Sequence, residues 1–200
     1  MKTKTHNLFN IGVLTAIGYL FTTPASSFIS AGILSIIGNT LIDSLGHKKK
    51  KVYLPAYDNK NRSGLFNFGR KNKQNKEVVI PVRTYKTHSL LRGTIWGLLP
   101  AIVLSFAVPY LPKDKYIILN GFPYWILIQG IFVGPLHLFL DLPTEEGIFV
   151  KKNGRFNRFA LAHIKYNDLF WNTVFQLIGI AFVILTFYKF TGGFHGFNYR

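Results

Sequence analysis

Histidines and aspartates at helical spacing are the residues of this chain whose types and positions suit chemistry. Asp43 is followed four residues later by His47, and His137 is followed four residues later by Asp141. On a helix, residues four apart share one face, with Cβ atoms about 5 to 6 Å from each other. That spacing suits either a shared metal ion or a direct hydrogen bond between imidazole and carboxylate.

Two further histidines stand beside apolar segments. His6 precedes the first such segment and His88 precedes the third. Carboxylates inside apolar membrane helices are disfavoured by roughly 2.5 to 3.5 kcal/mol on insertion scales, which makes Asp43 and Asp141 candidates for function. The chain has no cysteine, so a tightly held metal ion would need His, Asp or Glu ligands.

Apolar segments must position these residues. Long runs almost free of charge alternate with polar segments, and the chain carries 24 Lys and Arg against 8 Asp and Glu. Such segregation is typical of a polytopic membrane protein. We therefore expect an all-α fold, a transmembrane helical bundle of about five helices in a single membrane domain, with the fourth helix interrupted at Pro123 and at Gly134–Pro135. The expected spans are residues 8–21, 28–45, 89–110, 117–141 and 169–190.

Two polar segments connect these spans. Residues 47–86 carry twelve Lys and Arg and form a basic loop, in which Val52–Leu54 and Glu77–Val82 favour a short β-hairpin. Residues 142–168 form a second polar loop. Because the N-terminus and both loops hold most of the cations, the positive-inside rule places them in the cytoplasm. Attraction to the bilayer and its anionic lipid headgroups explains the basic loop better than nucleic acid does.

The N-terminal segment has a second interpretation. Lys2 and Lys4 precede a 14-residue apolar stretch, and small residues follow at Ala25–Ser27. This order also resembles a cleavable signal peptide, whose removal would take His6 with it. Both a retained helix and a cleaved signal are therefore compatible with residues 1–27.

Five crossings would bring four histidines and two aspartates to one depth at the cytoplasmic face. These residues are His6, Asp43, His47, His88, His137 and Asp141. Structural interpretations stand beside a shared site. His6 suits interfacial anchoring, Asp43 and Asn39 suit hydrogen bonds between helices, and Arg92 suits a counter-ion for an aspartate.

The motifs around these positions resemble a known family. They are Thr5-His6, Asp43 with Gly46-His47, Arg83-Thr-Tyr-Lys-Thr-His-Ser89, and Gly134-Pro-Leu-His-Leu-Phe-Leu-Asp-Leu-Pro-Thr144 followed by Gly147. Over about residues 3–148 the chain resembles the YdjM-like membrane-bound metal-dependent hydrolases, and most of all their archaeal and archaeal-virus branch of unknown function. It departs from the family's Asp-x-Asp-His pattern by offering Asn39, Asp43 and His47.

The resemblance implies a metal site and a hydrolytic activity. Its implied ligands to a divalent metal, with zinc as the leading candidate, are His6, Asp43, His47, His88, His137 and Asp141. We expect a phosphoester or lipid-type substrate at the cytoplasmic membrane face, in the host cell membrane if the protein is viral. Asp43 or Asp141 would accept the proton of water, and Arg92, Arg83 or Lys86 would orient a phosphate. Thr87 and Ser89 would donate hydrogen bonds to the site. The alternative is a non-enzymatic multi-pass membrane protein with a structural or membrane-remodelling role.

Overall fold

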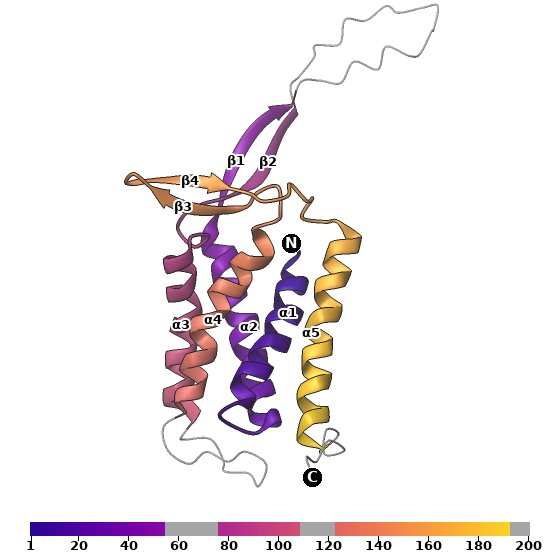
Figure 1. The fold of residues 1–200 in the computed structure, drawn as a ribbon. Helices are drawn as coiled ribbons and strands as arrows, with labels where there is room; N and C mark the ends of the chain where they lie inside the picture. The colour runs from indigo at the N-terminus through magenta and orange to yellow at the C-terminus, as the bar shows by residue number, and fades with distance from the viewer. Residues whose placement is uncertain (55–75, 109–122, 193–200) are drawn as a thin grey trace, which may run out of the picture. The chain divides into compact units, whose positions relative to one another are not determined.

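A computed structural model describes the chain except for residues 55–75, 109–122 and 193–200. Its helices are α1 (Thr3–Tyr19), α2 (Pro24–Gly46), α3 (Leu90–Ala107), α4 (Tyr124–Asp141) and α5 (Leu169–Phe190), and its strands are β1 (His47–Leu54), β2 (Lys76–Arg83), β3 (Ile148–Lys152) and β4 (Arg155–Phe159) (Figure 1). The prediction of a mainly helical chain is confirmed. "All-α" was too narrow, because both polar segments contain β-hairpins. The chain divides into two compact units, Met1–Gly46 with Thr84–Arg200, and His47–Arg83.

Helices α2, α3, α4 and α5 are each long and apolar enough to cross a membrane. Helix α1 begins at Thr3, before the expected start at residue 8, and ends at Tyr19. Residues 109–110 and 117–122 of the expected spans lie outside the described part of the chain. Pro123 immediately precedes α4, but the interruption expected at Gly134–Pro135 is wrong because α4 continues through both residues. Neighbouring helices commonly make a proline tolerable inside a membrane helix.

Glycines allow the closest helix contacts. Gly134 of α4 lies against the backbone of Gly93 in α3, so a Cβ added at Gly134 would collide with that backbone. Gly12 of α1 and Gly179 of α5 face each other in the same way. Small residues at such contacts let helix backbones approach closely, which is how apolar helices gain packing energy where the hydrophobic effect is absent.

A polar contact inside the helices joins α1, α2 and α4. Gln129 Nε2 donates to the Leu14 carbonyl at 2.8 Å and to Ser27 Oγ at 3.0 Å, and Ser30 Oγ donates to Gln129 Oε1 at 2.6 Å. Gln129 and Leu14 are completely buried. A buried amide without hydrogen-bond partners is costly. These contacts therefore stabilise one axial register of the three helices relative to one another.

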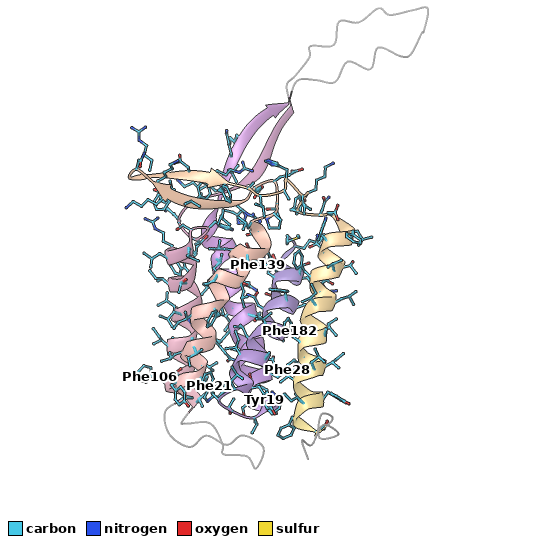
Figure 2. The ribbon with its side chains drawn as sticks, viewed as in Figure 1. Tyr19, Phe21, Phe28, Phe106, Phe139 and Phe182 are labelled. Carbon is cyan, nitrogen blue, oxygen red and sulfur yellow. The ribbon has the colours of Figure 1, made fainter. Side chains whose placement is uncertain are left out.

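The exterior of the helices is apolar. Figure 2 shows Phe21, Phe28 and Phe106 near one end of the helices and Phe139 near the other, and all four side chains are exposed. Helices α3 and α5 expose most of their apolar side chains. Soluble monomers rarely present continuous apolar surface on this scale. The exterior is therefore compatible with a multi-pass membrane protein.

The segment of residues 142–168 carries an antiparallel hairpin of β3 and β4. Asn153 and Gly154 connect the strands with positive φ angles of 51° and 77°, the conformation that two-residue hairpin turns require. The Phe149 amide donates to the His88 carbonyl at 2.7 Å, which fastens the hairpin to the residues that lead into α3. The second polar loop is therefore an ordered structure beside the helix ends.

The second unit, His47–Arg83, is itself a hairpin. Strands β1 and β2 pair antiparallel from His47 opposite Arg83 to Leu54 opposite Lys76. The predicted pairing of Val52–Leu54 with Glu77–Val82 is confirmed, and the ladder extends five residues further back, to His47.

Candidate metal centre

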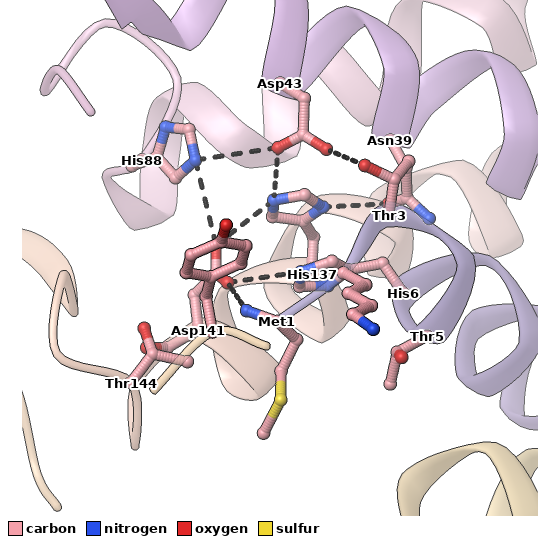
Figure 3. Close-up of polar contacts among 12 residues, drawn as sticks. Met1, Thr3, Thr5, His6, Asn39, Asp43, His88, His137, Asp141 and Thr144 are labelled. Carbon is pink, nitrogen blue, oxygen red and sulfur yellow. Dashed lines mark hydrogen bonds and ion pairs between the residues drawn. The ribbon is translucent and has the colours of Figure 1, made fainter. Parts of the chain in front are cut away.

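Five of the six predicted ligand residues come together where helix ends meet (Figure 3). His6 lies in the first turn of α1, Asp43 in the last turn of α2, and His88 two residues before α3. His137 and Asp141 share the last turn of α4. The sixth residue, His47, begins β1 and belongs to the separate hairpin unit.

Two imidazole nitrogens face the same two carboxylate oxygens. His137 Nε2 lies 3.4 Å from Asp43 Oδ1 and 3.2 Å from Asp141 Oδ2. His88 Nε2 lies 3.9 Å and 3.7 Å from those oxygens. Ligand atoms at 2.0 to 2.2 Å around one tetrahedral ion are separated by roughly 3.4 Å. The nitrogen-to-oxygen distances therefore fit the edges of a four-ligand metal site.

Asn39 determines which nitrogen of His137 faces the carboxylates. Asn10 Nδ2 donates to the Val133 carbonyl at 3.2 Å and to Asn39 Oδ1 at 3.1 Å, so the atom that Asn39 presents there is its oxygen. The same oxygen lies 3.1 Å from His137 Nδ1. Because an oxygen without hydrogen can only accept, Nδ1 carries the proton and neutral His137 presents the lone pair of Nε2.

Thr87 determines in the same way which nitrogen of His88 carries the proton. The Thr87 hydroxyl donates its one hydrogen to the Ile42 carbonyl at 2.8 Å. Its oxygen lies 2.9 Å from His88 Nδ1 and must accept there. Thr87 therefore acts as an acceptor toward His88 and not as the donor that we expected, and the lone pair of His88 Nε2 points toward Asp43 and Asp141.

Two nitrogen lone pairs and two carboxylates repel one another unless a cation lies among them. Either a metal ion or protons on the imidazoles would supply the positive charge. Proteins orient metal-binding histidines by such a hydrogen bond to the second ring nitrogen. The donor set is two imidazoles and two carboxylates, which suits zinc and similar divalent ions. The residues present thus fit the metal that the sequence predicted.

Asp141 also serves a second group of ligand atoms. His6 Nε2 lies 3.1 Å from Asp141 Oδ1, and the His6 ring stacks on the His137 ring with centroids 3.9 Å apart. The amino group of Met1 lies 3.1 Å from the same oxygen. His6, His137 and Asp141 offer ligand atoms within 4.8 Å of one another, as do Asp43, His88 and His137. His137 belongs to both groups, and Asp141 Oδ2 also lies 3.7 Å from His88 Nε2 of the second group, so the two candidate ion sites adjoin.

Asp43 marks the open side of the cluster. Its side chain is 24% exposed, whereas the three histidines and Asp141 are at most 1% exposed. Thr3 Oγ1 donates to Asp43 Oδ2 at 3.0 Å, which leaves Oδ1 for the histidines. Asp43 is therefore the most accessible residue of the cluster.

Arg92, predicted as a catalytic residue, lies outside this cluster. Its guanidinium carbon is 4.9 Å from the ring centre of Tyr85 and 5.1 Å from that of Phe156. In the described part of the chain no carboxylate pairs with it. Ser89, expected as a hydrogen-bond donor to the site, donates instead to the Tyr85 carbonyl at 3.2 Å.

Sequence reasoning missed several residues that support the cluster. Asn172 of α5 accepts from the Lys2 amide at 3.1 Å and from Thr5 Oγ1 at 2.6 Å, which ties the start of α1 to α5. Asn10 was missed as well, although an asparagine in an apolar helix signals a buried partner. Both residues hold the elements that carry His6 and His137.

One protein-family model matches the chain. No curated protein matches the chain, and no solved structure matches it. The family match covers residues 1–65 and 60–140, and these residues contain α1, α2, α3 and all of α4 except Asp141. The matched residues make up more than two thirds of the chain, which therefore belongs to the family described as "Protein of unknown function (DUF1286)".

Proposed function

We propose that this protein is a multi-pass membrane protein that hydrolyses a phosphoester with a divalent metal ion, zinc being the leading candidate, at the cytoplasmic membrane face. The observation that carries the proposal is the pair of histidine Nε2 lone pairs, those of His88 and His137, that converge on the carboxylates of Asp43 and Asp141. The resemblance to the YdjM-like hydrolases supports the same activity.

The membrane placement is supported by composition and by the exterior of the helices. Four helices are long and apolar enough to span, and their outward side chains are apolar. The cation bias puts the N-terminus in the cytoplasm. Since His6 lies in the first turn of α1, the cluster would then lie at the inner leaflet, beside anionic lipid headgroups.

The chain's own residues would divide the work of the reaction. His88, His137 and Asp141 would hold the ion and leave a position for water, and the ion when bound supplies Lewis-acid activation of that water and of a phosphoryl oxygen. Asn39 and Thr87 keep the two Nε2 lone pairs directed inward. Asp43 is in contact with solvent and would accept the proton that water loses.

Metal content and hydrolysis of the purified full-length chain test this proposal. We expect reconstitution with zinc to leave about one or more equivalents bound, and His88→Ala or His137→Ala to lower that content because each removes a ligand. We expect chelator-sensitive release of phosphate or headgroup from phospholipid vesicles. The matched control is His163→Asn, since His163 is exposed and its φ of 50° is one that asparagine tolerates.

Two outcomes would contradict the proposal. Metal content below about 0.2 equivalents after reconstitution, unchanged by His88→Ala, would show that protons occupy the cluster. Stoichiometric metal without any chelator-sensitive release would favour a structural role, in which the same polar groups hold the helices together.

A further inference from the structure

We propose that a groove between α3, α4 and the β3–β4 hairpin binds an anionic phospholipid, with an acyl chain along the apolar wall and the phosphate between Arg92 and Lys151. That this lipid is the substrate rests on the proposed function. The binding site itself does not, and the two are tested separately.

The groove is large and almost entirely apolar. Its volume is about 680 Å³, within the roughly 300 to 1,000 Å³ that small-molecule sites occupy. Its apolar lining includes Pro135 and Phe139 of α4, Leu91 of α3 and Phe149 of β3. Phe139 is 55% exposed, so the wall continues onto the apolar exterior of the helices. Such a wall suits an alkyl chain.

Three polar residues, Ser89, Arg92 and Lys151, line the groove. In the described ranges neither Arg92 nor Lys151 forms an ion pair with a carboxylate. The Arg92 guanidinium carbon lies 4.9 Å from the ring centre of Tyr85 and 5.1 Å from that of Phe156, and these two rings stack with centroids 4.7 Å apart. Contact with aromatic rings does not neutralise the charge of a guanidinium, which can still form a bidentate bond to phosphate.

The combination of wall and charge selects the ligand. A free phosphate would make no favourable contact with the apolar wall. An uncharged lipid would leave two cations beside apolar surface without a counter-ion. A phospholipid with net negative charge satisfies both parts of the groove. Its tail replaces water on the wall, and its phosphate pairs with Arg92 and Lys151.

The groove adjoins the candidate metal centre. Three residues that line the groove, Ser89, Leu138 and Leu142, directly follow candidate ligands in the sequence. Those ligands are His88, His137 and Asp141, respectively. The bond from the Phe149 amide to the His88 carbonyl holds the covering strand in place. The groove and the cluster are therefore formed by neighbouring residues of the same segments.

Native mass spectrometry of the full-length protein in detergent tests the site, with phosphatidylglycerol and phosphatidylcholine as probes. We expect wild type to prefer phosphatidylglycerol, and the double variant Arg92→Gln with Lys151→Gln to lose about tenfold of that preference, because both charges are gone. The matched control is Lys152→Gln. Lys152 is the next cation along β3 and does not line the groove, so its removal should leave the preference unchanged.

Further arms separate the alternatives. Ile148→Trp fills the groove and should weaken binding of both lipids at least fivefold, and inorganic phosphate at millimolar concentration should fail to displace phosphatidylglycerol. Unchanged lipid preference in the double variant, or displacement by inorganic phosphate with no effect of Ile148→Trp, would overturn the proposal. His88→Ala should keep the lipid and lose the metal. If the wild-type protein bound the lipid but never hydrolysed it, that result would contradict the proposed function and still support the proposed binding site.

Discussion

Asn39 Oδ1 lies 3.1 Å from His137 Nδ1, and this contact turns the other nitrogen of His137 toward two carboxylates. Asn39 and His137 come from different helices, α2 and α4. The contact therefore does two things at once. It joins the helices inside an apolar environment, and it selects the tautomer of a candidate ligand.

Asn39→Ala should weaken metal binding by roughly 10 to 100-fold, the usual cost of losing a hydrogen-bond partner behind a histidine ligand. The reason is that His137 would no longer be held with its proton on Nδ1. Competition with a chromogenic chelator measures the affinity. Asn39→Asp provides the control, because a carboxylate can still accept from Nδ1 and should keep metal affinity within a few-fold of the parent.

Equal affinity in Asn39→Ala and the parent would show that Asn39 serves only helix packing. Thermal unfolding without metal should be followed in parallel, since Asn39 also bonds Asn7 and Asn10 and its loss will lower stability by itself. The decisive quantity is the difference between the two substitutions in metal affinity.

Thr87→Val should lower both stability and metal affinity, whereas Thr87→Ser should preserve both. Valine has the shape of threonine without its hydroxyl, so the buried His88 Nδ1 and the Ile42 carbonyl would lose their shared partner. A buried polar group left without a partner costs about 1 to 3 kcal/mol. Thermal melts in detergent and chelator competition measure the two effects. If valine and serine behaved alike, the hydroxyl would have no orienting role.

Sequence reasoning selected five residues that lie together in the structure, because a polar residue in an apolar segment is conspicuous. Charge segregation predicted the spans, and helical spacing joined His137 to Asp141. The same spacing was wrong as a guide for Asp43 and His47, because α2 ends at Gly46 and His47 already belongs to a strand. Spacing in sequence predicts a shared face only where the helix continues.

Other features escaped for different physical reasons. The Asn153-Gly154 pair is a strong signal for a two-residue hairpin turn, and it was overlooked inside a segment interpreted as a loop. Asn10 contacts Asn39, which is 29 positions away in the sequence, and Asn172 contacts Thr5, which is 167 positions away. No local sequence pattern predicts such contacts. Which side chains meet across helices is decided by packing, and packing depends on small residues such as Gly93 and Gly134.

Gly134→Ala should separate α3 from α4, because its Cβ would overlap the backbone of Gly93 and Thr94. Overpacking costs typically 1 to 3 kcal/mol, which for a chain of this length corresponds to a fall in melting temperature of roughly 5 °C. Gly32→Ala is the matched control, since no atom lies within 4 Å of the added methyl group and alanine favours a helix. A melting temperature for Gly134→Ala at or above that of Gly32→Ala would contradict the close approach of α3 and α4.

Gly46→Ala should disturb the metal centre without changing any of its ligands. A Cβ at this position would overlap Thr87 Oγ1 and the ring of His88, so His88 must move away from Asp43 and Asp141. Helix propensity alone favours alanine over glycine by up to about 1 kcal/mol, so a loss cannot come from the helix itself. We expect metal affinity to fall about tenfold or more while the secondary structure seen by circular dichroism stays unchanged, since a shift of His88 removes one ligand. Metal binding as tight as in the parent would show that His88 is not a ligand, because the substitution displaces its ring.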